Sequence, residues 1–352
     1  MRFRASEVAD AVGGELIGDD VVLDGATQDS RTVTRGCLFV PLVAERDGRL
    51  VISKGPDGES AVALELAGSR VSDSDLKRLV SMPGLTRLDL SASLITDAGL
   101  RHLVSHETLE ALDLSRTRVS DGGLDALSSL KALRRLRVGF TRVRGRGLVG
   151  LKHVELLGLD GVQVSDATLE HVARLTSLKS LSLNRSRVSD QGLARLVPLV
   201  NLESLSLCGT PVGDTGMGHL LRLRGLERLE LSGTRVGDTG MAAVGRLTAL
   251  VALHLDRTRV GDGGVARLNG LERLEVLGLA ATRVTDASAA TLSRLPQLRE
   301  LSLAATRISD EGLQLLRQAS RLQHVELTLT ATTSLGRQGL EESITPVRRR
   351  DP

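Results

Sequence analysis

Residues 112–124 read Leu-Asp-Leu-Ser-Arg-Thr-Arg-Val-Ser-Asp-Gly-Gly-Leu, and this stretch decides the fold because close copies of it follow one another along the chain. Twelve copies begin with a pair of apolar residues, the first at Leu64 and the last at Val325. Ten of the eleven spacings are 24 residues, and the one that follows Leu136 is 21. Self-similarity at such a period predicts a solenoid, a fold that works by presenting a surface.

Each unit is expected to contain one short strand and one helix. Leu112 and Leu114 flank Asp113, and this alternation predicts a strand with both leucines facing inward. Ser120 is a favourable N-cap residue, so a helix is expected to begin at Asp121. The leucines that follow recur every three residues, which places them along one side of that helix.

This unit resembles the leucine-rich repeat of 24 to 26 residues that carries Cys or Thr before Val-Thr-Asp-x-Gly-Leu, as found in many bacterial proteins and in eukaryotic F-box receptors. The resemblance covers residues 61–340. It implies an α/β fold of about twelve repeats, a solenoid with a curved parallel sheet on its concave side and helices on its convex side. For function it implies only a recognition module.

Residues 1–48 do not carry the repeat. A short helix is expected at residues 5–12, and strands are expected at residues 15–17, 21–23 and 38–43.

The run Asp-Ser-Arg-Thr-Val at residues 29–33, followed by Gly-Cys-Leu-Phe-Val at residues 36–40 and by Asp47-Gly48, resembles the N-terminal domain of the Mur ligases. The member of that family that it resembles most adds D-alanyl-D-alanine. In that family the domain holds a uridine nucleotide, so the resemblance implies that Ser30 and Arg31 lie near such a site.

The resemblance to the ligases covers only part of their first domain. Arg35 replaces the usual Pro, and Ala44 stands where a Gly is expected. No phosphate-binding loop that ends in Gly-Lys-Thr or Gly-Lys-Ser occurs in the chain. We therefore expect no ligase activity. The alternative to nucleotide binding is that residues 1–48 are a remnant of a gene fusion that now covers the open end of the solenoid.

Two short segments flank the repeats. Residues 49–60 are expected to be a linker with a turn at Gly55-Pro56-Asp57-Gly58, across which residues 50–53 and 61–66 could pair as a hairpin. Such a pair would give the first repeat strand a neighbour. Residues 341–352 are expected to be a basic disordered tail.

Composition narrows the classes of partner. The 352 residues are 41% apolar and 1% aromatic, and the net charge is +3. Without aromatic side chains for base stacking and with a small net charge, nucleic acid is disfavoured as a partner. No stretch approaches the ~20 apolar residues of a membrane span, and the first residues lack the apolar centre of a signal peptide. We expect a monomer in the cytoplasm.

Few residues are candidates for metal or cofactor chemistry. Cys37 and Cys208 are far apart in the chain and make neither a disulfide framework nor a zinc site. His102 and His106 have a spacing that could bind a metal on a helix, but no third ligand is visible. We expect no metal, no cofactor and no catalytic residue.

Two polar columns are expected to be structural. A hydroxyl residue occupies the position of Thr117 in eleven units, and Asp occupies the position of Asp121 in ten. Buried turns leave backbone groups that need partners, which the hydroxyls can supply. Calcium loops gather several oxygen ligands within a few residues, so helix capping explains the carboxylates better than calcium does. The Asp column is Asp73, Asp97, Asp121, Asp166, Asp190, Asp214, Asp238, Asp262, Asp286 and Asp310.

An arginine follows the hydroxyl position in eight units and should face solvent at one edge of the sheet. Guanidinium groups on strands about 4.8 Å apart repel one another unless something neutralises them. Two interpretations stay open: the Asp column forms ion pairs with these arginines, or an acidic partner, a protein or another polyanion, binds them. The Arg column is Arg70, Arg118, Arg142, Arg187, Arg235, Arg259, Arg283 and Arg307.

The concave face is expected to be small and polar, and acidic towards its N-terminal end. Such a floor suits a broad protein contact better than a small-molecule pocket. Its candidate partner-binding residues are Asp89, Asp113, Arg116, Asp160, Arg185, His254, Asp256 and Arg257.

The short unit has Gly145 in place of the column Asp. Three missing residues are nearly one helical turn, so a local kink is expected. Phe140 is expected to fill the space that a shortened helix leaves, and a contact role is the alternative.

The sequence thus predicts a bacterial scaffold that binds another protein without catalysis. One alternative is a sensor that binds a uridine nucleotide or Mur enzymes through residues 1–48. The other is an effector-type receptor that selects substrates for other machinery, although the first 60 residues show no F-box-like set of helices.

Overall fold

The computed structural model describes residues 2–4, 22–24, 49–54, 60–80, 84–161 and 164–344, with side chains from residue 62 onward. Strands β1 (Arg2–Arg4) and β2 (Val22–Asp24) pair antiparallel, and β2 overlaps the strand expected at residues 21–23. The other elements expected in residues 1–48 lie outside the described residues. So do the candidate nucleotide site at Ser30 and Arg31 and the tail from residue 345.

The chain divides into two compact units, Met1–Val164 (unit 1) and Ser165–Pro352 (unit 2). In each unit the repeat strands follow one another in chain order and run parallel, one strand for each predicted repeat. Unit 1 contains β3 (Arg49–Lys54), β4 (Ser60–Glu65), β5 (Leu85–Asp89), β6 (Ala111–Asp113), β7 (Arg135–Arg137) and β8 (Leu156–Gly158). Unit 2 contains β9 (Ser180–Ser182), β10 (Ser204–Ser206), β11 (Arg228–Glu230), β12 (Ala252–His254), β13 (Val276–Gly278), β14 (Glu300–Ser302) and β15 (His324–Glu326).

The predicted hairpin is confirmed. Strand β3 pairs antiparallel with β4 over six residues on each strand, and β4 then pairs parallel with β5. The first repeat strand therefore has neighbours on both sides, which removes an open sheet edge at this place.

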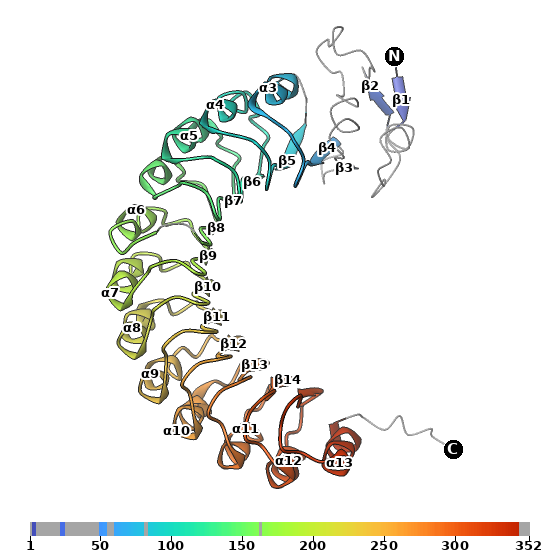
Figure 1. The fold of residues 1–352 in the computed structure, drawn as a ribbon, viewed down its shortest axis with the longest axis vertical. Coiled ribbons are helices and arrows are strands. Elements are labelled where there is room, and N and C mark those ends of the chain that lie inside the picture. Colours follow the sequence, from blue (N-terminus) through green and yellow to red (C-terminus); the bar gives the residue numbers. More distant parts are fainter. Residues whose placement is uncertain are drawn as a thin grey trace. The chain divides into compact units, whose positions relative to one another are not determined.

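Short helices cover the outer side of each unit, and the strands form the inner face (Figure 1). Most helices begin at the column Asp and last one or two turns, several of them continuing as a 3₁₀ turn. In unit 1 they are α3 (Asp73–Leu76), α4 (Asp97–Leu100) and α5 (Asp121–Ala126). In unit 2 they are α6 (Leu169–Val172), α7 (Asp190–Leu193), α8 (Asp214–Met217), α9 (Asp238–Val244), α10 (Asp262–Val265), α11 (Ala289–Leu292), α12 (Asp310–Leu316) and α13 (Ser334–Ile344).

The core lies between the strands and the helices. Leu112 and Leu114 are 2% and 0% exposed, and Leu124 and Leu127 from the helical side are fully buried. Both leucines point inward, as the alternation predicts, because residues two apart on extended backbone face the same side. Stacked leucines from neighbouring repeats thus bury a continuous apolar layer, the main source of stability in such a fold.

The hydroxyl column has the structural role that the sequence predicts. The Thr117 hydroxyl donates a 2.6 Å hydrogen bond to the carbonyl of Leu114, and Thr258 donates to Leu255 at the same distance. Just before each hydroxyl the backbone takes a positive φ. Eight of these residues are not glycine, and Ala281 (φ 54°) and Ala305 (φ 54°) are two of them.

The Asp column caps helices in a way that the sequence did not predict. Ser120 is the N-cap of its own helix and accepts a hydrogen bond from Gly122, as expected. The Asp97 carboxylate, in contrast, serves the next repeat: it accepts the Ser120 amide at 2.7 Å and the Ser120 hydroxyl at 2.5 Å. The same bond, from one repeat to the next, recurs with nine other members of the column.

This bond explains the glycine of the Asp-x-Gly-Leu motif. A Cβ on Gly216 would lie 2.6 Å from Oδ1 of Asp190, the carboxylate of the preceding repeat. Gly240 stands in the same relation to Asp214, at 2.7 Å. An apolar side chain here would crowd the carboxylate, which favours glycine. Ser288, which takes this position after Asp262, donates its hydroxyl to the carboxylate.

The short unit differs from its neighbours in two ways. A five-residue 3₁₀ helix, Arg146–Gly150, replaces the α-helix, and Gly145 before it has a φ of 103°. The prediction for Phe140 is wrong: its side chain is 44% exposed and its φ is 56°. The Arg116 guanidinium lies over the Phe140 ring, and its Cζ is 5.2 Å from the ring centroid. The expected kink stays a prediction.

Candidate binding surfaces

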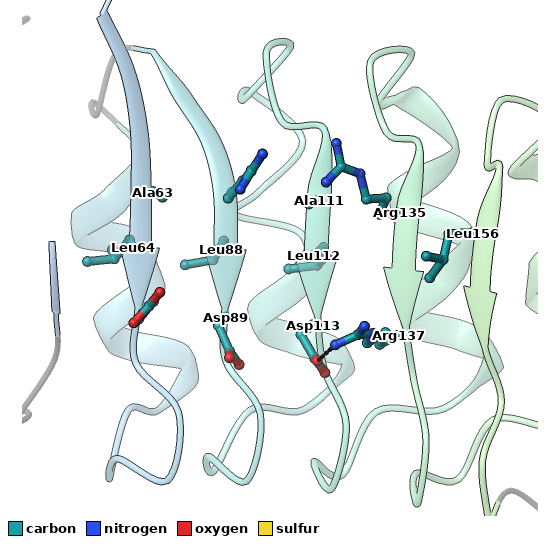
Figure 2. A pocket seen from close by; sticks show the side chains of 12 residues that line it. Ala63, Leu64, Leu88, Asp89, Ala111, Leu112, Asp113, Arg135, Arg137 and Leu156 are labelled. Atoms are coloured by element: carbon teal, nitrogen blue, oxygen red, sulfur yellow. Dashed lines mark ion pairs between the residues drawn. The ribbon is translucent and has the colours of Figure 1, made fainter. Parts of the chain in front are cut away.

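An open depression of about 520 Å³ lies on the inner face of unit 1, over strands β4 to β8. Side chains on a strand alternate between its two faces, so the residues before and after each inward leucine face the depression. Figure 2 shows these side chains in two rows that cross the strands.

The two rows carry opposite charges. Glu65, Asp89 and Asp113 stand side by side in the register of the sheet and form the acidic row. Arg87 and Arg135, each directly before the inward leucine of its strand, form the basic row, with Ala111 between them.

Only part of this charge is paired locally. The guanidinium of Arg137 lies 3.8 Å from the Asp113 carboxylate, and the Arg137 side chain is 64% exposed. The carboxylates of Asp89 and Asp113 each accept the backbone amide two residues on, at 2.8 Å. Arg87 and Arg135 are exposed. A partner that lies across the strands would therefore meet both rows, and on β5 it would meet Arg87 and Asp89, two residues or about 6.6 Å apart along the strand.

The sequence predicts this surface only in part. Asp89 and Asp113 are predicted from the positions after the first leucine of each strand, whereas Arg87 and Arg135 stand before that leucine and are not among the predicted residues. The residue before that leucine also faces outward, by the same alternation, so the signal was present in the sequence.

The other predicted inner-face residues of unit 1 lie beyond the strands. Arg116 is exposed and takes a φ of 60° in the turn after β6. Asp160 is half-buried, and its carbonyl accepts the Phe140 amide at 2.6 Å.

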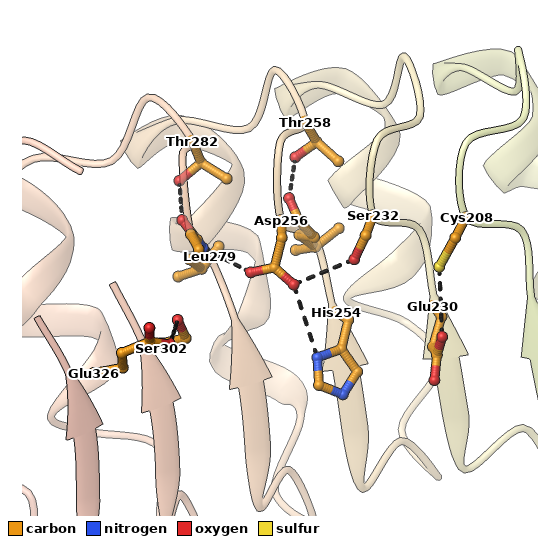
Figure 3. Close-up of polar contacts among 12 residues, drawn as sticks. Cys208, Glu230, Ser232, His254, Asp256, Thr258, Leu279, Thr282, Ser302 and Glu326 are labelled. Atoms are coloured by element: carbon orange, nitrogen blue, oxygen red, sulfur yellow. Dashed lines mark hydrogen bonds and ion pairs between the residues drawn. The ribbon is translucent and has the colours of Figure 1, made fainter. Parts of the chain in front are cut away.

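Unit 2 has a second, smaller depression of about 340 Å³ over strands β12 to β15, lined in part by the predicted residues His254 and Asp256. Asp256 accepts the amide of Ala280 at 2.7 Å and the hydroxyl of Ser232 at 3.2 Å, and Nδ1 of His254 lies 3.9 Å from its carboxylate (Figure 3). The surrounding backbone thus fixes Asp256. The predicted Arg185 and Arg257 lie in turns with φ of 55° and 57° and are exposed.

Cys208 lies on the same face, towards the N-terminal end of unit 2. Burial raises the pKa of its thiol, and the thiol donates a hydrogen bond to the Glu230 carboxylate at 3.4 Å. A nucleophilic cysteine needs the opposite shift, towards the thiolate.

All eight members of the Arg column are exposed, as predicted. In the part of the chain that the structure describes, no ion pair joins any of them to the Asp column. The ion-pair interpretation is therefore wrong, because the column carboxylates bond to backbone amides and hydroxyls of the next repeat instead.

Among the described residues, no group of three or more His, Cys, Asp or Glu side chains is placed to hold a metal ion. His102 is half-buried and His106 is buried.

None of the helices in the described ranges has the length and apolar character that crossing a membrane requires.

Comparisons with known proteins agree with this architecture. A family model described as leucine rich repeat matches residues 105–128 and 224–245. An internalin of Listeria monocytogenes superposes with a TM-score of 0.60 at 19% identity, over 83% of this chain and 90% of the internalin. A chain of the mouse RP105/MD-1 complex gives 0.58 at 21% identity, over 71% of this chain and 43% of that one.

One further relative is an enzyme. A stretch of 76 residues is 40% identical to the UDP-N-acetylmuramoyl-tripeptide–D-alanyl-D-alanine ligase of Escherichia coli, a match that spans 21% of this chain and 16% of the ligase. It is longer than the 48 residues that the motifs alone indicated. The repeats, the parallel sheets and the matches to the repeat family together make the chain a leucine-rich-repeat protein.

Proposed function

We propose that this protein is a non-catalytic scaffold of the cytoplasm that holds another protein on the inner face of unit 1. The observation that carries the proposal is the pair of oppositely charged rows on that face. Charged rows of this kind set the orientation of a partner and suppress wrong partners more than they add affinity.

The form of the surface favours a protein over a small molecule. Small-molecule sites are concave and mostly apolar, and they enclose most of the ligand. The depression in unit 1 is open, and five strands contribute to it, so it can contact an extended area of a partner.

The described side chains favour binding over chemistry. Cys208 has a raised thiol pKa, and His254 contacts a carboxylate that the backbone already fixes. A nucleophile needs a base within hydrogen-bond reach to be activated. Cys208 has the Glu230 carboxylate within hydrogen-bond reach, but the raised pKa of its thiol opposes the thiolate that a nucleophilic cysteine needs.

Site-specific photo-crosslinking tests the proposal. The full chain would carry benzoylphenylalanine at position 111, between Arg87 and Arg135, or at position 129 on the helical side as the matched control. We expect a defined protein adduct in cells from position 111 only. The adduct should disappear when Arg87 and Arg135 are both changed to Ala. Equal adducts from both positions, or an adduct that survives the double change, would contradict the proposal.

The match to the Escherichia coli ligase supports a second candidate function, a sensor of uridine nucleotides through the ligase-like segment. That enzyme is named for a UDP-linked substrate, and Ser30 and Arg31 belong to the motif that resembles it. Isothermal titration of the full chain with UDP-N-acetylmuramic acid tests this function. Binding that Arg31→Ala removes and Arg35→Ala retains would support a sensor, and no heat of binding at millimolar ligand would exclude it.

A further inference from the structure

Four members of the Arg column stand on consecutive repeats of unit 2: Arg235, Arg259, Arg283 and Arg307. Parallel bridges join the backbone at this level, with Gly237 opposite Arg259 and Gly261 opposite Arg283. Neighbouring arginines of this four-arginine row therefore start from backbones at the spacing of sheet strands, about 4.8 Å.

Among the described residues, the row has no ion-pair partner. The carboxylates of the Asp column bond to the next repeat instead: Asp238 accepts the Gly261 amide at 2.7 Å, and Asp262 accepts the amide and the hydroxyl of Thr285. Four exposed guanidinium groups in line repel one another, and an acidic partner would relieve that repulsion.

Small residues border the row on both sides. Gly237 and Gly261 lie on the side of the helices, and Ala281 and Ala305 lie in the turns on the other side. Arg257, which is exposed at the same turn position, is the exception: it adds a further positive charge beside the path of a rod-shaped partner.

The spacing of the row distinguishes two forms of partner. A helix with one carboxylate per turn repeats every ~5.4 Å, so its mismatch with a ~4.8 Å row reaches only about 1.8 Å over three steps. Flexible arginine side chains can absorb that difference. An extended strand presents same-face side chains every ~6.6 Å, and its mismatch reaches about 5.4 Å, which is more than one whole repeat.

We propose that the four-arginine row binds an acidic helical segment of a partner protein, with one carboxylate for each repeat. This inference rests on the proposed scaffold function and adds a second contact surface to it. Each exposed pair contributes little, so the row acts through the number of pairs.

The test uses the full chain and a fluorescent, alanine-rich helical peptide with one glutamate per turn on a single face. Its matched control has the same composition, with the glutamates distributed around the helix. The row variant changes Arg235, Arg259, Arg283 and Arg307 to Gln. The control variant makes the same change at four exposed arginines on the helical side: Arg224, Arg246, Arg267 and Arg294.

Fluorescence anisotropy at low salt should show binding of the one-face peptide that weakens about tenfold or more in the row variant and by less than about threefold in the control variant. The distributed peptide should bind about tenfold more weakly than the one-face peptide. Equal losses in both variants, or equal binding of both peptides, would overturn the proposal. Tighter binding of oligothymidylate of the same charge would overturn it in favour of nucleic acid.

The two proposals can fail separately. The peptide assay measures binding of a designed ligand to unit 2, whereas the crosslink from position 111 detects the cellular partner on unit 1. If the peptide does not bind and the crosslink still forms, the four-arginine row is not a binding surface and the scaffold function is still supported.

Discussion

At the scale of single residues, the contact between Gly216 and Asp190 makes the first prediction. Gly216→Ala places a Cβ 2.6 Å from Oδ1 of Asp190 and 3.0 Å from the Leu193 side chain, so the carboxylate or the helix must shift. We expect the free energy of unfolding to fall by about 1–3 kcal/mol. Urea denaturation followed by circular dichroism measures the change.

Gly218→Ala is the matched control for this prediction. Its Cβ would meet nothing within 4 Å, and its backbone is helical with φ −59°. Because alanine also restricts the unfolded chain, we expect Gly218→Ala to be neutral or stabilising by up to about 1 kcal/mol. Equal effects at both glycines would show that helix propensity, and not the carboxylate, decides the first result.

Ala281 gives a second prediction at this scale. Its φ of 54° lies in the left-handed region, where a Cβ costs about 1 kcal/mol and glycine is free of that cost. Ala281→Gly should therefore stabilise the protein by about 0.5–1 kcal/mol, the reverse of the usual effect of glycine. Ala289→Gly, which removes a buried methyl group from helix α11, should destabilise it by about 1 kcal/mol. Thermal unfolding of the two variants separates these outcomes.

At the scale of elements, the bond of each Asp to the next repeat links stability to pH. Burial alone would raise the pKa of Asp262, but hydrogen bonds from Ser288 and from Thr285 outweigh it and hold that pKa below its ordinary value. Asp310, which is half-buried, also has a lowered pKa, and the hydroxyl and amide of Thr333 are the main cause.

A carboxylate whose pKa is lower in the folded state contributes stability above its unfolded pKa, and that contribution is lost as the pH falls through the folded pKa. We therefore expect unit 2 to lose stability below about pH 4, the unfolded value for Asp. Asp262→Asn should make this loss smaller while lowering stability at pH 7, because the amide has only one oxygen and its NH2 group cannot accept a hydrogen bond, so one carboxylate oxygen of the present network is lost. Urea midpoints between pH 7 and pH 3 measure both effects, and parallel curves for the two proteins would contradict the assignment.

The elements themselves follow from local patterns in the sequence. The Leu-x-Leu strands, the helix start after Ser120 and the hairpin ahead of the first repeat are confirmed, because each depends on neighbours in the chain. The role of the Asp column was predicted only in part, since its bonds reach 23 residues along the chain. Periodicity aligns such positions, but it does not say whether a carboxylate turns to its own helix or to the next one.

At the scale of the whole molecule, alignment of repeats predicts which residues share a surface, but it does not predict which of them are already paired. The Arg column was found from the sequence, and whether it had carboxylate partners was settled only by the directions of the Asp side chains. The basic row of unit 1 was missed for a simpler reason, the omission of one outward position. Phe140 was placed wrongly because its positive φ turns the side chain outward, which a pattern of apolar residues does not encode.

The same scale gives the last prediction, which concerns cooperativity. In a repeat protein, stability is a sum of repeat terms and of the contacts between neighbouring repeats. Gly145 has no carboxylate to offer the following repeat, and Thr168 occupies the position that is glycine in most other repeats. The two compact units divide between Val164 and Ser165, in the repeat that follows Gly145.

We therefore expect the two units to unfold in separate steps. Hydrogen exchange read by mass spectrometry in increasing urea should give one midpoint for peptides from residues 85–140 and another for peptides from residues 180–320. Asp97→Ala removes the bonds to Ser120 and should lower only the first midpoint. Asp238→Ala removes the bond to Gly261 and should lower only the second, each by about 1–3 kcal/mol in unfolding free energy. If either change lowered both midpoints equally, cooperativity would extend through the short repeat, and the missing carboxylate at position 145 would have no thermodynamic consequence.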